Sequence, residues 1–144
     1  MKLDFGIARI ADNHTIVNQK KYELFGLSPR YAAPETFARI YMKNAGSTPA
    51  DAEKLSDIFS YSVMLWELLV RKVPWDGMST NDIELNVRSG KYPPDPHLGS
   101  SARAGLDALM KQCRSMEPTS RPSFGVIVKR LTGFADQMKF AISR

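Results

Sequence analysis

The sequence of 144 residues has one cysteine, two histidines and no long apolar run. A single cysteine, Cys113, excludes an internal disulfide framework, and His14 and His97 cannot by themselves form a zinc cluster. A membrane helix needs about 20 consecutive apolar residues, and the N-terminus carries Lys2 and Asp4 where a signal peptide would be apolar. We therefore expect a cytoplasmic protein that has no membrane contact and no structural metal.

The charge pattern argues against nucleic-acid binding. Basic residues outnumber acidic ones by 20 to 15, which gives a formal net charge of +5. The basic residues are scattered, however, and the longest run is Lys20-Lys21, so no basic stripe is formed. The hydrophobic fraction of 43% and the charged fraction of 24% are typical of one ordinary domain with enough apolar material for a core.

The first part of the chain is predicted to be irregular. Residues 4–34 show no sustained hydrophobic periodicity, and loops of this length in a compact domain are usually functional or disordered. A short helix is predicted from Pro34 to Met42, because proline suits the first position of a helix. Turn-forming residues at 44–49 break that helix, and we predict a variable insertion near 44–55.

The strongest helical signal runs from Ser56, which can cap a helix, to Val70. Apolar residues occupy nearly every side of this segment, so we predict a helix buried in the core that ends before Pro74. Three amphipathic helices are predicted after it, within residues 80–90, 101–117 and 121–138. No convincing set of strands is present, and the predicted fold class is mainly α. The last helix is expected to place six apolar residues on one stripe: Phe124, Ile127, Val128, Leu131, Phe134 and Met138.

Several short motifs occur in a fixed order. Asp4-Phe5-Gly6 is followed by Ala33-Pro34-Glu35, with 31 positions from Asp4 to Glu35 (35 minus 4). The later motifs are Ser56-Asp57-Ile58 with Trp66-Glu67-Leu68, then Pro74-Trp75, then Arg121-Pro122-Ser123. Together they resemble a eukaryotic-type protein kinase domain from its Asp-Phe-Gly triplet onward. The style is closest to the tyrosine-kinase-like group of serine/threonine kinases.

The resemblance implies a fold and a cofactor. Residues 1–144 would form a partial kinase domain, with an activation segment at 4–35, a helical C-lobe at 36–140 and no N-lobe. The family uses ATP and Mg²⁺, and Asp4 is similar to its magnesium ligand. Phe5 is similar to the apolar plug of the family, and Gly6 would let the backbone turn sharply.

The resemblance also implies a site for a protein substrate. Four consecutive residues are similar to the segment that receives the substrate peptide, and a hydroxyl at the first of them implies serine/threonine specificity: Ser28, Pro29, Arg30 and Tyr31. Phosphate added to a loop hydroxyl can order the loop by pairing with arginine. The candidate phosphorylation sites are Thr15, Tyr22 and Ser28, and the alternative is that each is an ordinary loop hydroxyl.

The remaining motif residues imply structural roles. Glu35 and Arg121 are similar to the family's buried ion pair, with two unrelated surface charges as the alternative. Asp57 resembles the carboxylate that holds the catalytic loop, and Trp66 belongs to the motif of the central helix.

The sequence departs from the family in what it lacks. The glycine-rich loop, the phosphate-binding lysine and the His-Arg-Asp loop precede Asp-Phe-Gly in kinases, and none is present here. We expect weak or no binding of ATP and Mg²⁺ by this chain alone. Three hypotheses follow: part of a working serine/threonine kinase, a short non-catalytic interaction or regulatory module, or an unrelated helical binding domain. One bare side of the central helix predicts self-association or a partner that supplies a helix.

Overall fold

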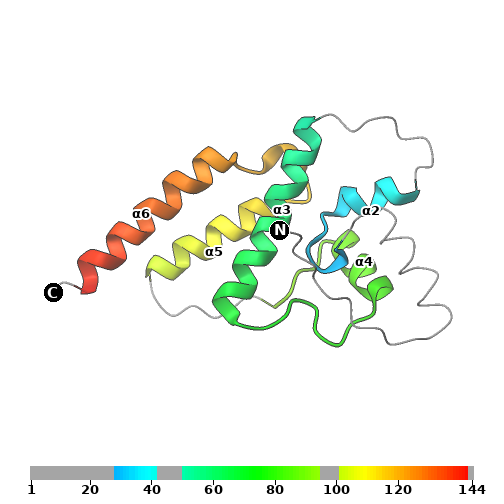
Figure 1. Cartoon of the computed structure of the whole chain (residues 1–144), viewed down its shortest axis with the longest axis horizontal. Coiled ribbons are helices and arrows are strands. Elements are labelled where there is room, and N and C mark those ends of the chain that lie inside the picture. Colours follow the sequence, from blue (N-terminus) through cyan, green and yellow to red (C-terminus); the bar gives the residue numbers. More distant parts are fainter. Residues whose placement is uncertain (1–27, 42–49, 95–100, 143–144) are drawn as a thin grey trace, which may run out of the picture.

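The computed structural model describes residues 28–41, 50–94 and 101–142. These residues form helices and no strand, which confirms the mainly α fold. Figure 1 shows α3 in the middle, with α5 and α6 on one side and α2 and α4 on the other. The elements are η1 (Pro29–Tyr31), α2 (Pro34–Tyr41), α3 (Ala50–Val70), α4 (Thr80–Arg88), α5 (Ser101–Cys113), η2 (Pro118–Ser120) and α6 (Phe124–Ile142).

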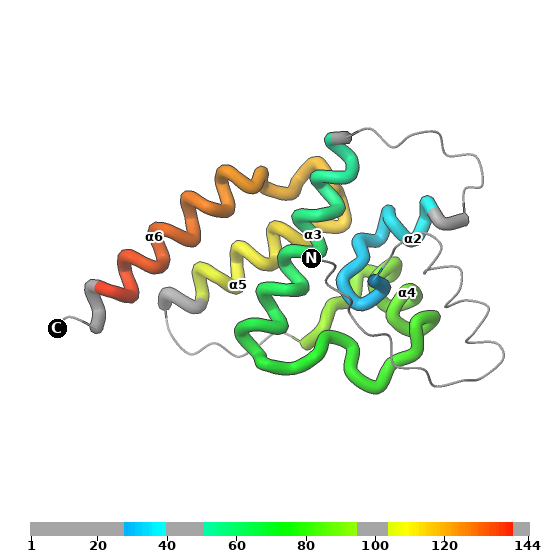
Figure 2. The backbone as a smooth tube through the Cα atoms, viewed as in Figure 1, coloured from blue at the N-terminus to red at the C-terminus, as the bar shows by residue number. Residues whose placement is uncertain are grey.

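The short 3-10 helix η1 positions the candidate site. It lies against both α3 and α4, near the middle of the molecule (Figure 2). The helix α2 follows directly after it and packs against α4. No helix in the part of the chain that the structure describes is long and apolar enough to cross a membrane.

The central helix α3 begins at Ala50, so the prediction that Ser56 caps it is wrong. Ala50, Ala52 and most of the residues that follow are good helix formers, and Asp51 and Glu53 place negative charge at the positive end of the helix. Ser56 therefore lies inside the helix, where its hydroxyl oxygen is 3.1 Å from the carbonyl oxygen of Ala52. Residues 44–49 are outside the described ranges, and the insertion near 44–55 stays a prediction.

The helix α5 ends at Cys113, earlier than predicted. Side chains in the following residues offer the backbone another set of hydrogen bonds. Ser115 Oγ accepts from the backbone N–H of Glu117 at 3.2 Å, and Glu117 Oε1 accepts from the N–H of Thr119 at 3.3 Å. Glu117 is extended, because a proline disfavours helical geometry in the residue before it. Pro118 then starts η2, since proline suits the first position of a helix.

The apolar stripe predicted on α6 is only partly correct. Ile127 is 1% exposed, and Leu131 and Phe134 pack beside it against the core. Val128 and Met138, by contrast, are 61% and 48% exposed. Val128 is about 100° around the helix from Ile127, so the two cannot both face α5.

Within the described residues, most buried apolar side chains belong to two clusters that share α3. Neighbouring residues Ile58 and Phe59 enter different clusters, because consecutive side chains of a helix point in different directions. On the remaining side of α3, Met64 and Leu68 are 44% and 66% exposed. This bare side agrees with the expectation that α3 is not fully covered. The first cluster comprises Ala32, Ala33, Phe37, Phe59, Val63, Trp75, Ile83 and Val87, and the second comprises Ile58, Leu109, Cys113 and Ile127.

Gly105 lets the ring of Phe134 approach the backbone of α5. A β-carbon at position 105 would lie 2.5 Å from Phe134 Cε1, closer than such atoms approach. We expect Gly105→Ala to lower the free energy of unfolding by about 1–3 kcal/mol, because the ring must shift within a packed core. The control is Gly133→Ala on α6, where no heavy atom other than the helix's own nearby backbone and the two neighbouring residues lies within 4 Å of the new carbon.

The control variant should raise the free energy of unfolding by about 0.5–1 kcal/mol through helix propensity alone. Urea denaturation followed by circular dichroism measures both variants. A stabilised Gly105→Ala variant would show that the ring of Phe134 does not need the space left by the absence of a β-carbon at position 105.

Candidate functional site

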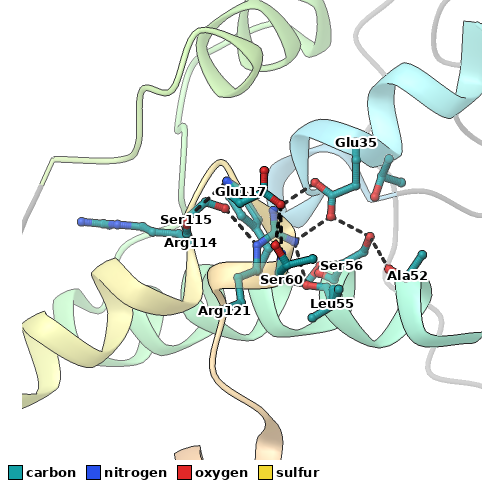
Figure 3. Close-up of polar contacts among 12 residues, drawn as sticks. Glu35, Ala52, Leu55, Ser56, Ser60, Arg114, Ser115, Glu117 and Arg121 are labelled. Atoms are coloured by element: carbon teal, nitrogen blue, oxygen red, sulfur yellow. Dashed lines mark hydrogen bonds and ion pairs between the residues drawn. The ribbon is translucent and has the colours of Figure 1, made fainter.

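Glu35 and Arg121 form a two-pronged ion pair (Figure 3). Arg121 Nη1 donates to Glu35 Oε1 at 2.6 Å, and Arg121 Nη2 donates to Glu35 Oε2 at 3.0 Å. Two parallel bonds fix the orientation of both groups as well as their distance. The partners are 86 positions apart, so the pair joins the start of α2 to the loop before α6 and closes most of the described chain.

The guanidinium of Arg121 is buried and satisfied by several acceptors. Its side chain is 0% exposed, whereas the side chain of Glu35 is 27% exposed. Nη1 also donates to the carbonyl oxygen of Leu55 at 2.7 Å, and Nε donates to that of Ser115 at 2.9 Å. The guanidinium carbon lies 5.2 Å from the ring centre of Phe59. The buried charge therefore holds four segments together: the start of α2, the helix α3, the loop after α5 and the loop before α6.

The carboxylate of Glu35 has further partners on α3. The Ser56 hydroxyl lies 2.9 Å from Glu35 Oε1, and its single proton is shared between this oxygen and the Ala52 carbonyl (Figure 3). Burial alone would raise the pKa of the Glu35 carboxyl. The hydrogen bonds from Arg121 and Ser56, the local backbone and the arginine charge outweigh burial and lower this pKa below its ordinary value.

Arg30 and Tyr31 fasten the segment before α2 to the end of α3. Arg30 Nη1 donates to the carbonyl oxygens of Pro74 at 2.7 Å and Trp75 at 2.9 Å. The Tyr31 hydroxyl donates to Glu67 Oε2 at 2.5 Å. Burial, together with the hydrogen bond to Glu67 and its negative charge, raises the pKa of Tyr31 to about 12. The phenol therefore stays neutral and keeps its proton for this bond at neutral pH.

The four predicted peptide-binding residues lie in one continuous segment. Ser28 precedes η1 in an extended conformation, is exposed, and makes no capping hydrogen bond through its side chain. Pro29 starts η1, and the side chains of Arg30 and Tyr31 are both bonded to other parts of the fold. The role of this segment in substrate binding stays a prediction.

The other predicted structural residues differ in burial. Ala33 is 0% exposed and belongs to the first core cluster, and Pro34 begins α2. Trp66 is buried, and its indole N–H donates to the carbonyl oxygen of Pro94 at 2.8 Å. Asp57 is exposed on α3, and its assignment to a catalytic loop stays a prediction.

The candidate metal ligand cannot be placed. Asp4, Phe5, Gly6, Thr15 and Tyr22 all lie outside the described residues. Within residues 28–41, 50–94 and 101–142, no group of three or more His, Cys, Asp or Glu side chains could hold a metal ion. The assignment of magnesium to Asp4 therefore stays an expectation.

Sequence reasoning missed the surroundings of a second buried arginine. Arg114 is 4% exposed, and its guanidinium carbon lies 4.6 Å from the ring centre of Tyr92. The Tyr92 hydroxyl donates to the carbonyl oxygen of Arg114 at 2.6 Å. A cation directly after an amphipathic helix normally lies on the surface, so no sequence pattern predicts this stacking.

The fold and the site define a helical lobe that presents one loop segment, from Ser28 to Glu35. Hydrogen bonds of Arg30 and Tyr31 hold one end of this segment, and the ion pair of Glu35 holds the other. The sequence model of the protein tyrosine and serine/threonine kinase family matches residues 2–131. The chain therefore belongs to this protein kinase family and carries the C-terminal part of its domain.

Individual relatives include a probable kinase, a scaffold protein and a receptor. Probable serine/threonine-protein kinase drkC of Dictyostelium discoideum is 38% identical over 76 residues, which are 53% of this chain and 10% of that protein. Scaffold protein ILK of Homo sapiens is 32% identical over 111 residues, 76% of this chain and 22% of that protein. Macrophage colony-stimulating factor 1 receptor 1 of Takifugu rubripes is 30% identical over 150 residues, 98% of this chain and 13% of that protein. The chain thus spans only a small part of each relative.

Proposed function

We propose that this chain is the substrate-facing helical part of a serine/threonine protein kinase domain. The observation that carries the proposal is the clamped segment from Ser28 to Glu35. Arg30 and Tyr31 fix one end of it to α3 and the turn that follows, and the ion pair of Glu35 fixes the other. Phosphoryl transfer depends mainly on positioning, and a substrate hydroxyl is positioned best against a segment that is itself held.

The parent activity would be ATP-dependent phosphorylation of protein. Magnesium, when bound, neutralises charge on the phosphates, and Asp4 is the residue assigned to it by the motif. Serine/threonine kinases carry a hydroxyl at the position that Ser28 resembles, and this supports serine/threonine rather than tyrosine specificity. The chain itself contributes the held peptide segment and the helical support beneath it.

The chain alone is expected to transfer no phosphate. Its 144 residues contain no His-Arg-Asp sequence, and a general base and correct positioning are each worth orders of magnitude in rate. The measurement is incubation of the purified chain with labelled ATP, magnesium and a generic basic protein. Metal-dependent labelling by the chain that Asp4→Asn abolishes would contradict this expectation.

A chimera tests whether this chain supports phosphorylation of protein when the upstream half of a kinase domain is supplied. Fusing the upstream half of an active tyrosine-kinase-like domain ahead of Lys2 should give labelling of serine or threonine in the basic protein. Asp4→Asn in the fusion should abolish the labelling, whereas Asp51→Asn, which removes an exposed carboxylate on α3, should leave it unchanged. A well-folded fusion that never labels protein would overturn the proposal.

A second candidate is a non-catalytic interaction or regulatory module of the same family. One observation favours it: a relative that is 32% identical over 76% of this chain is named a scaffold protein. In such a module the clamped segment and the helices would bind a partner protein without phosphoryl transfer.

The bare side of α3 separates the two candidates. Part of a larger domain should expose Met64 and Leu68 and therefore bind a hydrophobic dye, self-associate, or need a partner that supplies a helix. Size-exclusion chromatography with dye binding and thermal unfolding measures this, and Leu68→Glu should reduce dye binding more than Leu85→Glu on α4. A monodisperse monomer with cooperative unfolding and no dye binding would favour the independent module.

A further inference from the structure

The second half of α6 extends past the core of the molecule. Ile127 is 1% exposed and Phe134 packs beside it, but every residue from Ala135 to Lys139 is exposed. Figure 1 shows that this end of α6 reaches beyond α5. Helices in proteins are stabilised mostly by the packing of an apolar face rather than by propensity. An uncovered helix end that carries apolar side chains therefore indicates a surface for a partner.

Five apolar residues of α6 form a seam, which is the name used below for this set. They are separated alternately by four and three positions: Phe124, Val128, Leu131, Ala135 and Met138. This is the spacing of the a and d positions of a coiled coil, in which two helices pack along a narrow apolar stripe. Phe124 already packs edge-on against Tyr61 of α3, with ring centroids 5.9 Å apart, and Leu131 packs partly against the second core cluster. Val128 and Met138 are 61% and 48% exposed, so the open part of the seam lies between them.

The order of large and small residues along the seam matches a second copy in the antiparallel orientation. With a two-fold axis at the level of residue 133, Val128 of one copy meets Met138 of the other (128 plus 138 is 266). Leu131 then meets Ala135 of the other copy (131 plus 135 is 266). Each layer combines an a position with a d position, and Leu131 fills the space beside the small Ala135. A parallel pair would place Ala135 opposite itself and leave space between the helices unfilled.

Charge beside the seam favours the same orientation. Lys129 and Asp136 are seven positions apart, so both lie on one side of the seam. In the antiparallel pair, Lys129 of one copy comes level with Asp136 of the other (129 plus 136 is 265), and two-fold symmetry repeats this match. In a parallel pair each of the two residues would come level with its own like charge. Lys139 lies 4.0 Å from Asp136 in the same copy and is exposed, so these charges set the orientation more than the affinity.

We propose that the seam of α6 binds a second copy of this chain and forms an antiparallel, two-fold symmetric helix pair. The surface is distinct from the bare side of α3, where Met64 and Leu68 are exposed on another helix. The inference does not depend on the proposed kinase function, because only α6 takes part in the pairing. Because the open seam spans only Val128 to Met138, the pairing is reversible and the fraction of dimer rises with the concentration of the chain.

Sedimentation equilibrium of the full chain tests the surface. All samples carry Leu68→Glu, which suppresses association through the bare side of α3, and a monomer–dimer equilibrium should remain. Val128→Glu should raise the dissociation constant of this dimer at least about tenfold, because it buries a charge without a partner in the seam. The matched control is Val126→Glu, on the same helix and 47% exposed but about 200° around it from Val128, and it should leave the constant unchanged. Both valines are exposed in the single chain, so circular dichroism should show both variants folded.

Disulfide cross-linking tests the orientation. Val128→Cys and Met138→Cys are made as separate variants, and the native Cys113 is 1% exposed and out of reach. In the antiparallel pair, positions 128 and 138 share a layer, where Cα atoms come within the range of about 4.4–6.8 Å that a disulfide requires. Position 128 and its own copy differ in height by ten residues, or about 15 Å. Oxidation should therefore cross-link a mixture of the two variants and leave each variant alone without a cross-link.

Three results would overturn the proposal. A Leu68→Glu chain that stays monomeric at every concentration would show that the seam does not bind a second copy and is open to a helix from outside this sequence. Equal weakening by Val126→Glu and Val128→Glu would show that the dimer does not use the seam. A cross-link that forms with Val128→Cys alone, and no faster in the mixture, would exclude the antiparallel pair.

Discussion

Replacing either Glu35 or Arg121 with alanine is expected to lower the free energy of unfolding by about 3–5 kcal/mol, because the other charge is left buried without its partner. Arg121→Ala should have the larger effect. Arg121→Ala removes a side chain that is 0% exposed and also takes away a donor from the carbonyl oxygens of Leu55 and Ser115, whereas Glu35→Ala removes a side chain that is 27% exposed.

The double variant separates a contact from two independent effects. It should lose clearly less stability than the sum of the two single variants, as measured by urea denaturation. Effects that add within about 0.5 kcal/mol would show that Glu35 and Arg121 do not interact. The matched control is the pair of Asp51 and Lys54 on α3, 3.3 Å apart with side chains 91% and 69% exposed. Alanine at either control position should cost about 0.5 kcal/mol or less, because exposed pairs are hydrated and screened.

The ion pair of Glu35 with Arg121 should make the free energy of unfolding depend on pH. The pKa of Glu35 is lower in the folded chain than its ordinary value, so the folded state favours the carboxylate. Its contribution is fully present above the ordinary pKa of a glutamate and is lost as pH falls through the lowered pKa of the folded state. Glu35→Gln should remove this part of the acid dependence while keeping the shape of the side chain.

The helical part of the fold could be predicted because its signals are local. The apolar run that ends at Val70 and the break at Pro74 depend on residues close together in sequence, and so does the helix that begins at Pro34. The ion pair of Glu35 and Arg121 was predicted differently, by resemblance. Spacing alone could not join two residues that lie 86 positions apart.

The contacts between elements could not be predicted from the sequence, because they depend on which faces of the helices meet. Val128 is as apolar as Ile127, yet only one of them faces α5, because the rotation of α6 is set by its partner helix. Arg30 binds carbonyl oxygens, which every residue carries, so no sequence pattern identifies Pro74 and Trp75 as its acceptors. Helix ends also shift where side chains such as Ser115 offer the backbone another partner.

Truncation of Phe59 is the second change with a large expected effect. Its side chain is 1% exposed, belongs to the first core cluster and lies beneath the guanidinium of Arg121. Phe59→Ala should lower the free energy of unfolding by about 3–5 kcal/mol through lost burial and the cavity left behind. Phe59→Leu keeps most of the volume and should cost about 1.5 kcal/mol or less from packing alone.

The position of Phe59 beneath Arg121 makes a further consequence testable. If the ring supports the guanidinium, Phe59→Leu should also weaken the coupling between Glu35 and Arg121 when the double-mutant cycle is repeated in that background. Leu68→Ala is the control, because Leu68 lies on the same helix but is 66% exposed, and it should change stability by about 0.5 kcal/mol or less. A coupling that stays at its original size in the Phe59→Leu background would show that the ring fills space under Arg121 without holding it. A cost for Leu68→Ala as large as that for Phe59→Ala would contradict the assignment of the core to the other faces of α3.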